Sequence, residues 1–168
     1  KLGYVPQKGV LFSGTIDSNI RYGKPEITDA QVKEAAEVAQ ATEFIDTKPE
    51  KYKSPVSQGG TNVSGGQKQR LSIARAIAKD PEIFIFDDSF SALDFKTDSQ
   101  LRKALKEYTK DATTVIVAQR ISTILGADQI IVLDDGHMAG IGTHKELMAN
   151  CEVYQQIARS QLSEEELA

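Results

Sequence analysis

Cysteine is almost absent from this chain: Cys151 is the only one in 168 residues, so no internal disulfide can form. This composition fits a reducing compartment. Two histidines and one cysteine are also too few to argue for a metal site built from those ligands. No apolar run approaches the ~20 residues of a membrane-spanning helix, and the first residues lack the pattern of a secretory signal peptide. The net charge is −4 without any basic block, which argues against nucleic acid as a partner.

The remaining composition is that of a folded globular protein. Apolar residues make up 40% of the chain and charged residues 26%, both ordinary values. A length of 168 residues predicts one compact domain with a sizeable core. The chain opens on a strand-like segment, residues 2–6, without an initiator methionine, which suggests a fragment of something longer.

Strand-like and helix-like segments alternate along the chain. Apolar, β-branched runs predict strands at residues 2–6, 83–86, 113–118 and 129–133, and a turn at residues 134–136 predicts a hairpin into residues 137–141. Periodicity predicts helices at residues 29–40, 67–79, 97–110, 122–125, 145–150 and 153–161. Residues 47–62 lack a period and predict a loop, and the acidic residues 163–167 predict a solvated helical tail. Strands that alternate with helices indicate an α/β fold with a mainly parallel sheet.

The most informative segment is V-S-G-G-Q-K-Q-R, residues 63–70, just before an apolar helical pattern. Ser64, with Gln67 three residues later, predicts a capping box at the start of a helix. Gly65 and Gly66 then leave backbone N–H groups that no side chain covers. A helix start of this kind favours binding of an anion such as phosphate.

A second motif is the apolar strand at residues 83–86, which ends in Asp87. A buried strand fixes the backbone, so its terminal carboxylate can face a phosphate-bound Mg²⁺ through water. Many strands end in aspartate simply because it is a turn residue. The motif therefore gains weight from its position after the helix of residues 67–79.

Residues 63–70 resemble the signature motif of ATP-binding cassette (ABC) ATPases, L-S-G-G-Q-x-Q-R, with valine in place of the first leucine. Asp87 then resembles the Walker B aspartate of that family. Residues 91–94, S-A-L-D, resemble its D-loop, and Gln7 resembles its Q-loop glutamine. The resemblance implies a P-loop NTPase (RecA-like) fold, α/β with a mainly parallel sheet and an α-helical ABC subdomain.

The same resemblance implies ATP and Mg²⁺ as cofactors and gives each motif a role. The signature residues contact ATP bound by a partner subunit, and the D-loop Asp94 lies at the interface between the two ATP sites. Asp87 and Gln7 hold Mg²⁺ through water, and Gln7 also reaches the attacking water. The implied signature residues are Ser64, Gly65, Gly66 and Gln67.

Two positions depart from the catalytic pattern of the family. Asp88 occupies the position where glutamate normally orients the attacking water, and its carboxylate falls short by roughly 1.5 Å, which can cost on the order of 10²-fold in rate. Gln119 occupies the switch position, where histidine normally contacts the γ-phosphate; an amide cannot carry a cationic imidazolium. A tolerated conservative exchange would explain Asp88 alone. The two departures together indicate a site that has lost its hydrolytic role.

Two further segments have family counterparts. Residues 56–60, V-S-Q-G-G, lie where ABC exporters carry the X-loop, with Gln58 in place of its usual glutamate. Each of Gln7 and Gln58 could also be an ordinary surface residue. The spacing to the signature argues against this alternative more strongly for Gln7 than for Gln58. Residues 142–147 resemble a segment that opens a C-terminal helix, where Thr143 predicts a cap and His144 a structural residue.

A phosphate-binding loop of the form G-x-x-x-x-G-K-[S/T] is absent from the sequence, as is the aromatic residue that stacks on adenine in this family. The resemblance therefore predicts a nucleotide-binding domain truncated before the Q-loop. We expect residues 15–80 to form the helical subdomain, and residues 1–14 and 81–168 to form the RecA-like core and C-terminal helices. By itself this fragment is expected neither to bind ATP tightly nor to hydrolyse it.

The function that the resemblance implies is that of an ATPase subunit of an ABC exporter. The expected partners are a second nucleotide-binding subunit and a transmembrane domain, the latter on the same parent chain. The parent protein is expected to place this domain at the cytoplasmic face of the plasma membrane. The fragment itself is expected to be soluble. With Asp88 and Gln119, the chain resembles the degenerate-site subunit of a heterodimeric multidrug or lipid exporter. Two alternatives stay open: a non-hydrolytic regulatory module with the ABC fold, and a soluble ABC ATPase without membrane domains.

Overall fold

A computed structural model describes residues 1–163 of the chain. The chain forms two compact units, Lys1–Val117 and Ala118–Ala168. The predicted acidic tail, residues 163–167, lies outside the described residues except for Ser163. Within residues 1–163, no helix combines the length and the apolar character needed to cross a membrane.

A parallel sheet of three strands, in the order β1-β4-β5, organises the first unit. The strands are β1 (Leu2–Val5), β4 (Ile83–Asp87) and β5 (Thr113–Val117). Their register places Val5 beside Phe86 and Phe86 beside Ile116. This sheet confirms the prediction of parallel strands joined by crossover helices. Within the described residues β5 pairs only with β4, and Val115 and Val117 are exposed.

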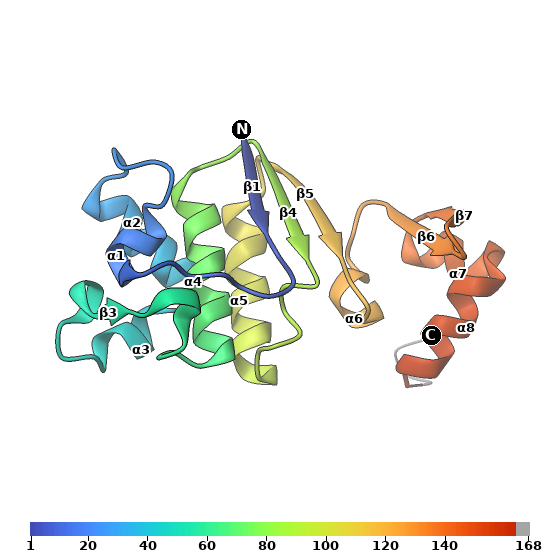
Figure 1. The fold of residues 1–168 in the computed structure, drawn as a ribbon. Coiled ribbons are helices and arrows are strands. Elements are labelled where there is room, and N and C mark those ends of the chain that lie inside the picture. Colours follow the sequence, from blue (N-terminus) through green and yellow to red (C-terminus); the bar gives the residue numbers. More distant parts are fainter. Residues whose placement is uncertain (164–168) are drawn as a thin grey trace. The chain divides into compact units, whose positions relative to one another are not determined.

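Two long helices, α4 (Gly65–Ala78) and α5 (Phe95–Tyr108), lie on one side of the sheet (Figure 1). Both begin at side-chain caps, Ser64 for α4 and Asp94 for α5. These caps move the helix starts to residues 65 and 95, two residues before the predicted starts in each case. The core between helices and sheet contains fully buried side chains of Leu71, Ile73, Ile77, Phe84, Phe86 and Leu101.

Smaller elements gather on the other side of α4 (Figure 1). They are β2 (Gly14–Thr15), α1 (Ile16–Ile20), α2 (Asp29–Val38), α3 (Thr42–Asp46) and β3 (Pro55–Val56), with single 3-10 turns at Lys51–Lys53 and Gln58–Gly60. The prediction of a plain loop at residues 47–62 was therefore wrong. The antiparallel pairing of β2 with β3 spans two residues of each strand, which is too short to leave a periodic pattern.

The second unit consists of α6 (Ile121–Ile124), the hairpin of β6 (Ile130–Asp134) with β7 (His137–Gly142), α7 (His144–Asn150) and α8 (Glu152–Gln161). The predicted hairpin turn is confirmed, since Asp135 and Gly136 have φ angles of 45° and 77°. Thr143 caps α7 as predicted, and His144 contacts the buried Tyr154 through a 2.8 Å hydrogen bond. The assignment of residues 15–80 and of the flanking ranges to two subdomains stays a prediction.

Candidate functional site

The N-terminus of α4 has the predicted capping box. The Gln67 N–H donates to Ser64 Oγ at 3.2 Å, and the Ser64 N–H donates to Gln67 Oε1 at 3.2 Å. The preceding N–H groups of Gly65 and Gly66 have no partner within the helix, because they belong to its first turn. A Cβ atom on Gly65 would meet nothing within 4 Å, so the helix end opens onto free space. This geometry suits a phosphate.

Gly66 lies close to the segment that resembles the D-loop. A Cβ atom on Gly66 would lie 3.4 Å from the carbonyl oxygen of Ala92. The segment ends in Asp94, which caps α5: the Thr97 N–H donates to its carboxylate at 2.9 Å and the Thr97 hydroxyl at 2.7 Å. These two bonds, and more weakly the charge of Arg70, hold the pKa of Asp94 below its ordinary value. Asp94 is therefore ionised and held in place.

Asp87 stands at the end of β4, as predicted, and receives a hydrogen bond that the sequence did not predict. The hydroxyl of Tyr4, on the neighbouring strand β1, donates to Asp87 Oδ2 at 3.1 Å. Because this bond stabilises the protonated phenol, the pKa of Tyr4 is raised. Tyr4 thus orients the carboxylate that is predicted to face Mg²⁺.

Gln7 and Asp88 meet at the same edge of the sheet, although they are 81 residues apart in sequence: Gln7 Nε2 donates to Asp88 Oδ2 at 3.2 Å. Asp88 has a left-handed backbone, with φ of 44°, and its N–H donates to the Val117 carbonyl at 2.8 Å. Aspartate and asparagine tolerate this conformation better than most residues. The structure therefore brings together three predicted site residues, Gln7, Asp87 and Asp88, at the carboxyl ends of β1 and β4.

Gln119 lies in the second unit, just before α6. Its carbonyl accepts from Gln161 Nε2 at 2.9 Å, and Gln161 Oε1 accepts from the Ile121 N–H at 2.9 Å. Thus α8 holds the backbone at the switch position, a contact across 42 residues that no sequence pattern indicated. Gln58 has a structural contact in the first unit, since its Oε1 accepts from the Ser13 N–H at 3.2 Å.

The described residues fit ATP and Mg²⁺ at two separate places. The N–H groups of Gly65 and Gly66, which lack partners within the helix, suit phosphate oxygens, and the partly exposed carboxylates of Asp87 and Asp88 suit Mg²⁺. Within residues 1–163, no group of three or more His, Cys, Asp and Glu side chains could hold a metal ion. That finding is compatible with Mg²⁺, which typically binds one or two carboxylates together with substrate phosphates.

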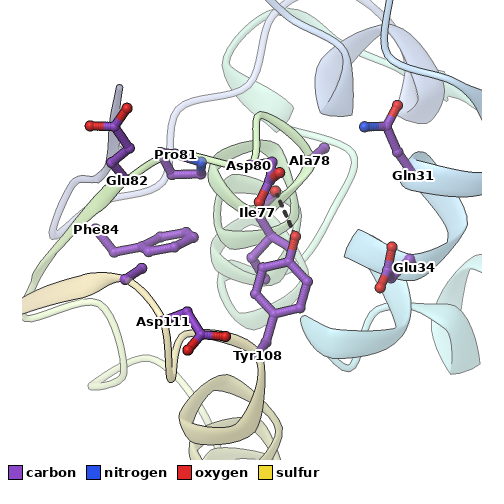
Figure 2. Close-up of a pocket in the computed structure, with 11 residues that line it drawn as sticks. Gln31, Glu34, Ile77, Ala78, Asp80, Pro81, Glu82, Phe84, Tyr108 and Asp111 are labelled. Atoms are coloured by element: carbon purple, nitrogen blue, oxygen red, sulfur yellow. Dashed lines mark hydrogen bonds between the residues drawn. The ribbon is translucent and has the colours of Figure 1, made fainter.

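A pocket of about 530 Å³ lies away from these residues. Figure 2 shows it between α2, the C-terminal end of α4 and α5, with the Tyr108 hydroxyl donating to the Ile77 carbonyl at 3.4 Å. Glu34, Asp80, Glu82 and Asp111 are among the residues that line it. Burial raises the pKa of Tyr108, and the charges of Asp80 and Glu34 add to that shift. None of the predicted site residues lines this pocket. The predicted site residues lie instead at the α4 start and the β4 end, which together stay the candidate site.

This combination of a parallel sheet, a capped glycine-rich helix start and an aspartate-ended strand defines an ABC ATPase fold, consistent with the P-loop NTPase class. Comparison with known proteins agrees. The family described as ABC transporter matches residues 1–91, more than half of the chain. The chain therefore belongs to the ABC transporter family, and its sequence is that of a nucleotide-binding domain.

Relatives and solved structures are similar over nearly the whole chain. An uncharacterized ABC transporter ATP-binding protein of Mycobacterium tuberculosis is 47% identical over 163 residues, which is 95% of this chain and 28% of that protein. A Staphylococcus aureus protein, provisionally named a multidrug export ATP-binding/permease protein, is 46% identical over 94% of this chain and 27% of its own length. The structure of a bacterial Atm1-family ABC exporter with ATP bound has a TM-score of 0.92 and 39% identity, over 97% of this chain and 29% of that one. The chain thus spans just over a quarter of the length of these relatives.

Proposed function

We propose that this chain is the ATP-binding part of an ABC exporter subunit, which uses ATP to drive transport across a membrane. The observation that carries the proposal is the signature: Ser64 caps α4, and Gly65 faces open space at its N-terminus. The Staphylococcus aureus relative and the Atm1-family structure support an exporter in particular. Domains of this family bind ATP with Mg²⁺, and exporter domains pair with a transmembrane domain and a second nucleotide-binding domain.

In the proposed assembly, two nucleotide-binding domains close around ATP. The Gly65 and Gly66 N–H groups of this chain bind the phosphate of ATP held by the partner, with the α4 dipole favouring that negative charge. Asp87 would hold Mg²⁺ at this chain's own ATP site, and Gln7 would contact the same ion. Bound Mg²⁺ neutralises charge that develops on the phosphates during transfer. Closure and reopening of the two nucleotide-binding domains, at the cytoplasmic face of the plasma membrane, would move the transmembrane domains.

We further propose that this chain's own ATP site is hydrolytically weak, so that the chain serves chiefly as a signature donor to a competent partner site. Asp88 stands where a longer carboxylate would orient water, and its carboxylate accepts a hydrogen bond from Gln7. The switch position holds Gln119, which lacks an imidazole ring. The contrast between an intact signature and these two positions supports a heterodimer with unequal sites.

Replacing Asp88 by asparagine is expected to lower ATPase turnover of the full-length heterodimer by less than about threefold, because a slow site contributes little to the total rate. The exchange is nearly isosteric, and asparagine tolerates the left-handed backbone at φ 44°, so it removes charge without disturbing the turn. Steady-state ATPase assays measure the effect. A loss of ~10²-fold or more would make Asp88 a working base and contradict the unequal-site proposal.

A further inference from the structure

The loop that carries Gln7 lies along α4. The buried side chain of Gln69, the second glutamine in residues 63–70, holds the loop there. Gln69 is 2% exposed. Its Nε2 donates to the Pro6 carbonyl at 3.0 Å, and its Oε1 accepts from the Gly9 N–H at 2.9 Å. One amide therefore bonds the backbone on both sides of Gln7, across 63 and 60 residues of sequence. Both polar atoms of the side chain are satisfied by this loop.

The packing at Gly9 leaves the loop little room to move away from α4. A Cβ atom at Gly9 would lie 2.7 Å from Ser72 Oγ, 3.0 Å from Gln69 Oε1 and 3.0 Å from the Lys68 carbonyl oxygen. A side chain at this position would crowd α4, so that the loop or the Ser72 side chain would have to shift. The absence of a side chain at Gly9 is what permits the 2.9 Å bond to Gln69.

A second side chain of α4 fixes the continuation of the loop. Arg75 Nη1 donates to the Val10 carbonyl at 2.8 Å, and its Nε donates to the Asn19 carbonyl at 2.8 Å. The guanidinium also lies 5.2 Å from the ring centroid of Phe12. The loop is thus attached to α4 at two places, Gln69 and Arg75.

We propose that Gln69 is a positioning residue that couples Gln7 to the signature at the start of the same helix. Because its amide grips the backbone before and after Gln7, a displacement of that loop must carry α4 or break two buried hydrogen bonds. The signature glycines begin α4 only a few residues before Gln69. Binding of ATP at this chain's own site would thereby shift the position of the signature glycines that contact the partner's ATP. The inference deepens the proposed function and rests on it.

A double-mutant cycle in the full-length transporter with its partner subunit tests the coupling. Gln69→Met keeps the side-chain length and removes both hydrogen bonds, and Gln7→Ala removes the amide of Gln7. We expect each single variant to lower kcat about tenfold, with a smaller change in KM for ATP, because each would misplace the signature that serves the partner's competent site. Once Gln69 is lost, Gln7→Ala should lower kcat no further than about twofold. The proposal would be overturned if the loss of kcat in the double variant equalled the product of the two single losses. Normal turnover in Gln7→Ala would also overturn it.

Hydrogen exchange and two matched variants separate positioning from general damage. The Gly9 amide should exchange about fivefold to tenfold faster in Gln69→Met. It should not change in Ser72→Ala, whose hydroxyl bonds only back to Lys68 at 3.0 Å on the same helix face. Gly9→Ala approaches the same contact from the loop: it keeps Gln69 and places a Cβ 3.0 Å from Gln69 Oε1, so it should lower kcat in the same direction even if Gln69→Met does not fold. Unchanged exchange at Gly9 in Gln69→Met, or normal turnover in Gly9→Ala, would refute the coupling.

The outcome for the proposed function is read separately. If the wild-type transporter hydrolyses ATP and Gly65→Asp stops it, the proposed function stands whatever the cycle gives. If the wild type shows no ATPase activity, the proposed function itself fails.

Discussion

A transporter that carries Gly65→Asp is expected to lose at least ~10²-fold of its ATPase rate, because the new carboxylate would stand where the phosphate of the partner's ATP docks. Like charges at close range in a site closed off from water cost several kcal/mol. The substitution should not harm folding: a Cβ at Gly65 meets nothing within 4 Å, and aspartate in the first turn of a helix is favourable. Steady-state ATPase assays of the purified heterodimer measure the loss.

Two control variants isolate the charge at Gly65. Gly65→Ala adds the Cβ without the carboxylate, so its turnover should stay within a few-fold of wild type. Gly126→Asp places the same carboxylate at another glycine whose Cβ would meet nothing within 4 Å, and its turnover should be normal. If Gly65→Ala lost as much turnover as Gly65→Asp, the added Cβ atom and not the carboxylate charge would cause the loss. Undiminished turnover in Gly65→Asp would place the phosphate elsewhere and remove the basis of the proposed function.

Replacing Phe86 by alanine is expected to lower the free energy of unfolding of the first unit by about 3–5 kcal/mol, the usual cost of a Phe→Ala exchange in a core. Phe86 is 1% exposed, and its ring lies 5.9 Å from that of Phe84 and 5.5 Å from that of Phe90, measured between centroids. The same strand carries Asp87 at its end, so the loss would also disturb the site. Urea unfolding followed by circular dichroism gives the free energy.

The chain offers a matched control for Phe86 in Phe95, the first residue of α5, which is 86% exposed. Phe95→Ala removes the same number of atoms from water rather than from the core, so it should change stability by no more than ~0.5 kcal/mol. Similar losses in the two variants would mean that the sheet and helices do not form the core described.

Local patterns in the sequence were sufficient to predict the parts of the site that depend on neighbouring residues. The capping box at Ser64 needs only Gln67 three residues later, and the strand that ends in Asp87 needs only its own apolar run. The hairpin turn at Asp135 and Gly136 is likewise set by residues that accept positive φ. These features were confirmed because short-range physics determines them.

Contacts between distant segments could not be predicted in this way. The bonds from Gln69 to Pro6 and Gly9, and from Tyr4 to Asp87, depend on how α4 and β1 pack after folding. A buried glutamine on a helix looks, in sequence, like any polar residue of the exposed face. The signal that could have revealed Gln69 is its place in residues 63–70, where it is the second glutamine of the segment that resembles the signature motif. Short elements such as α1 and α3 were missed because a helix of five residues has no measurable period.

The hydrogen bond from Tyr4 to Asp87 gives the molecule a built-in optical reporter. The chain has no tryptophan and five tyrosines, so its near-ultraviolet absorbance comes chiefly from phenol rings. The Tyr4 hydroxyl donates to the Asp87 carboxylate, which is proposed to hold Mg²⁺. That hydrogen bond is the main reason why the pKa of Tyr4 is raised. A cation bound at Asp87 would compete for the same oxygen and return the pKa of Tyr4 toward its ordinary value. The near-ultraviolet absorbance change that accompanies phenolate formation at alkaline pH would then report metal binding without any added dye.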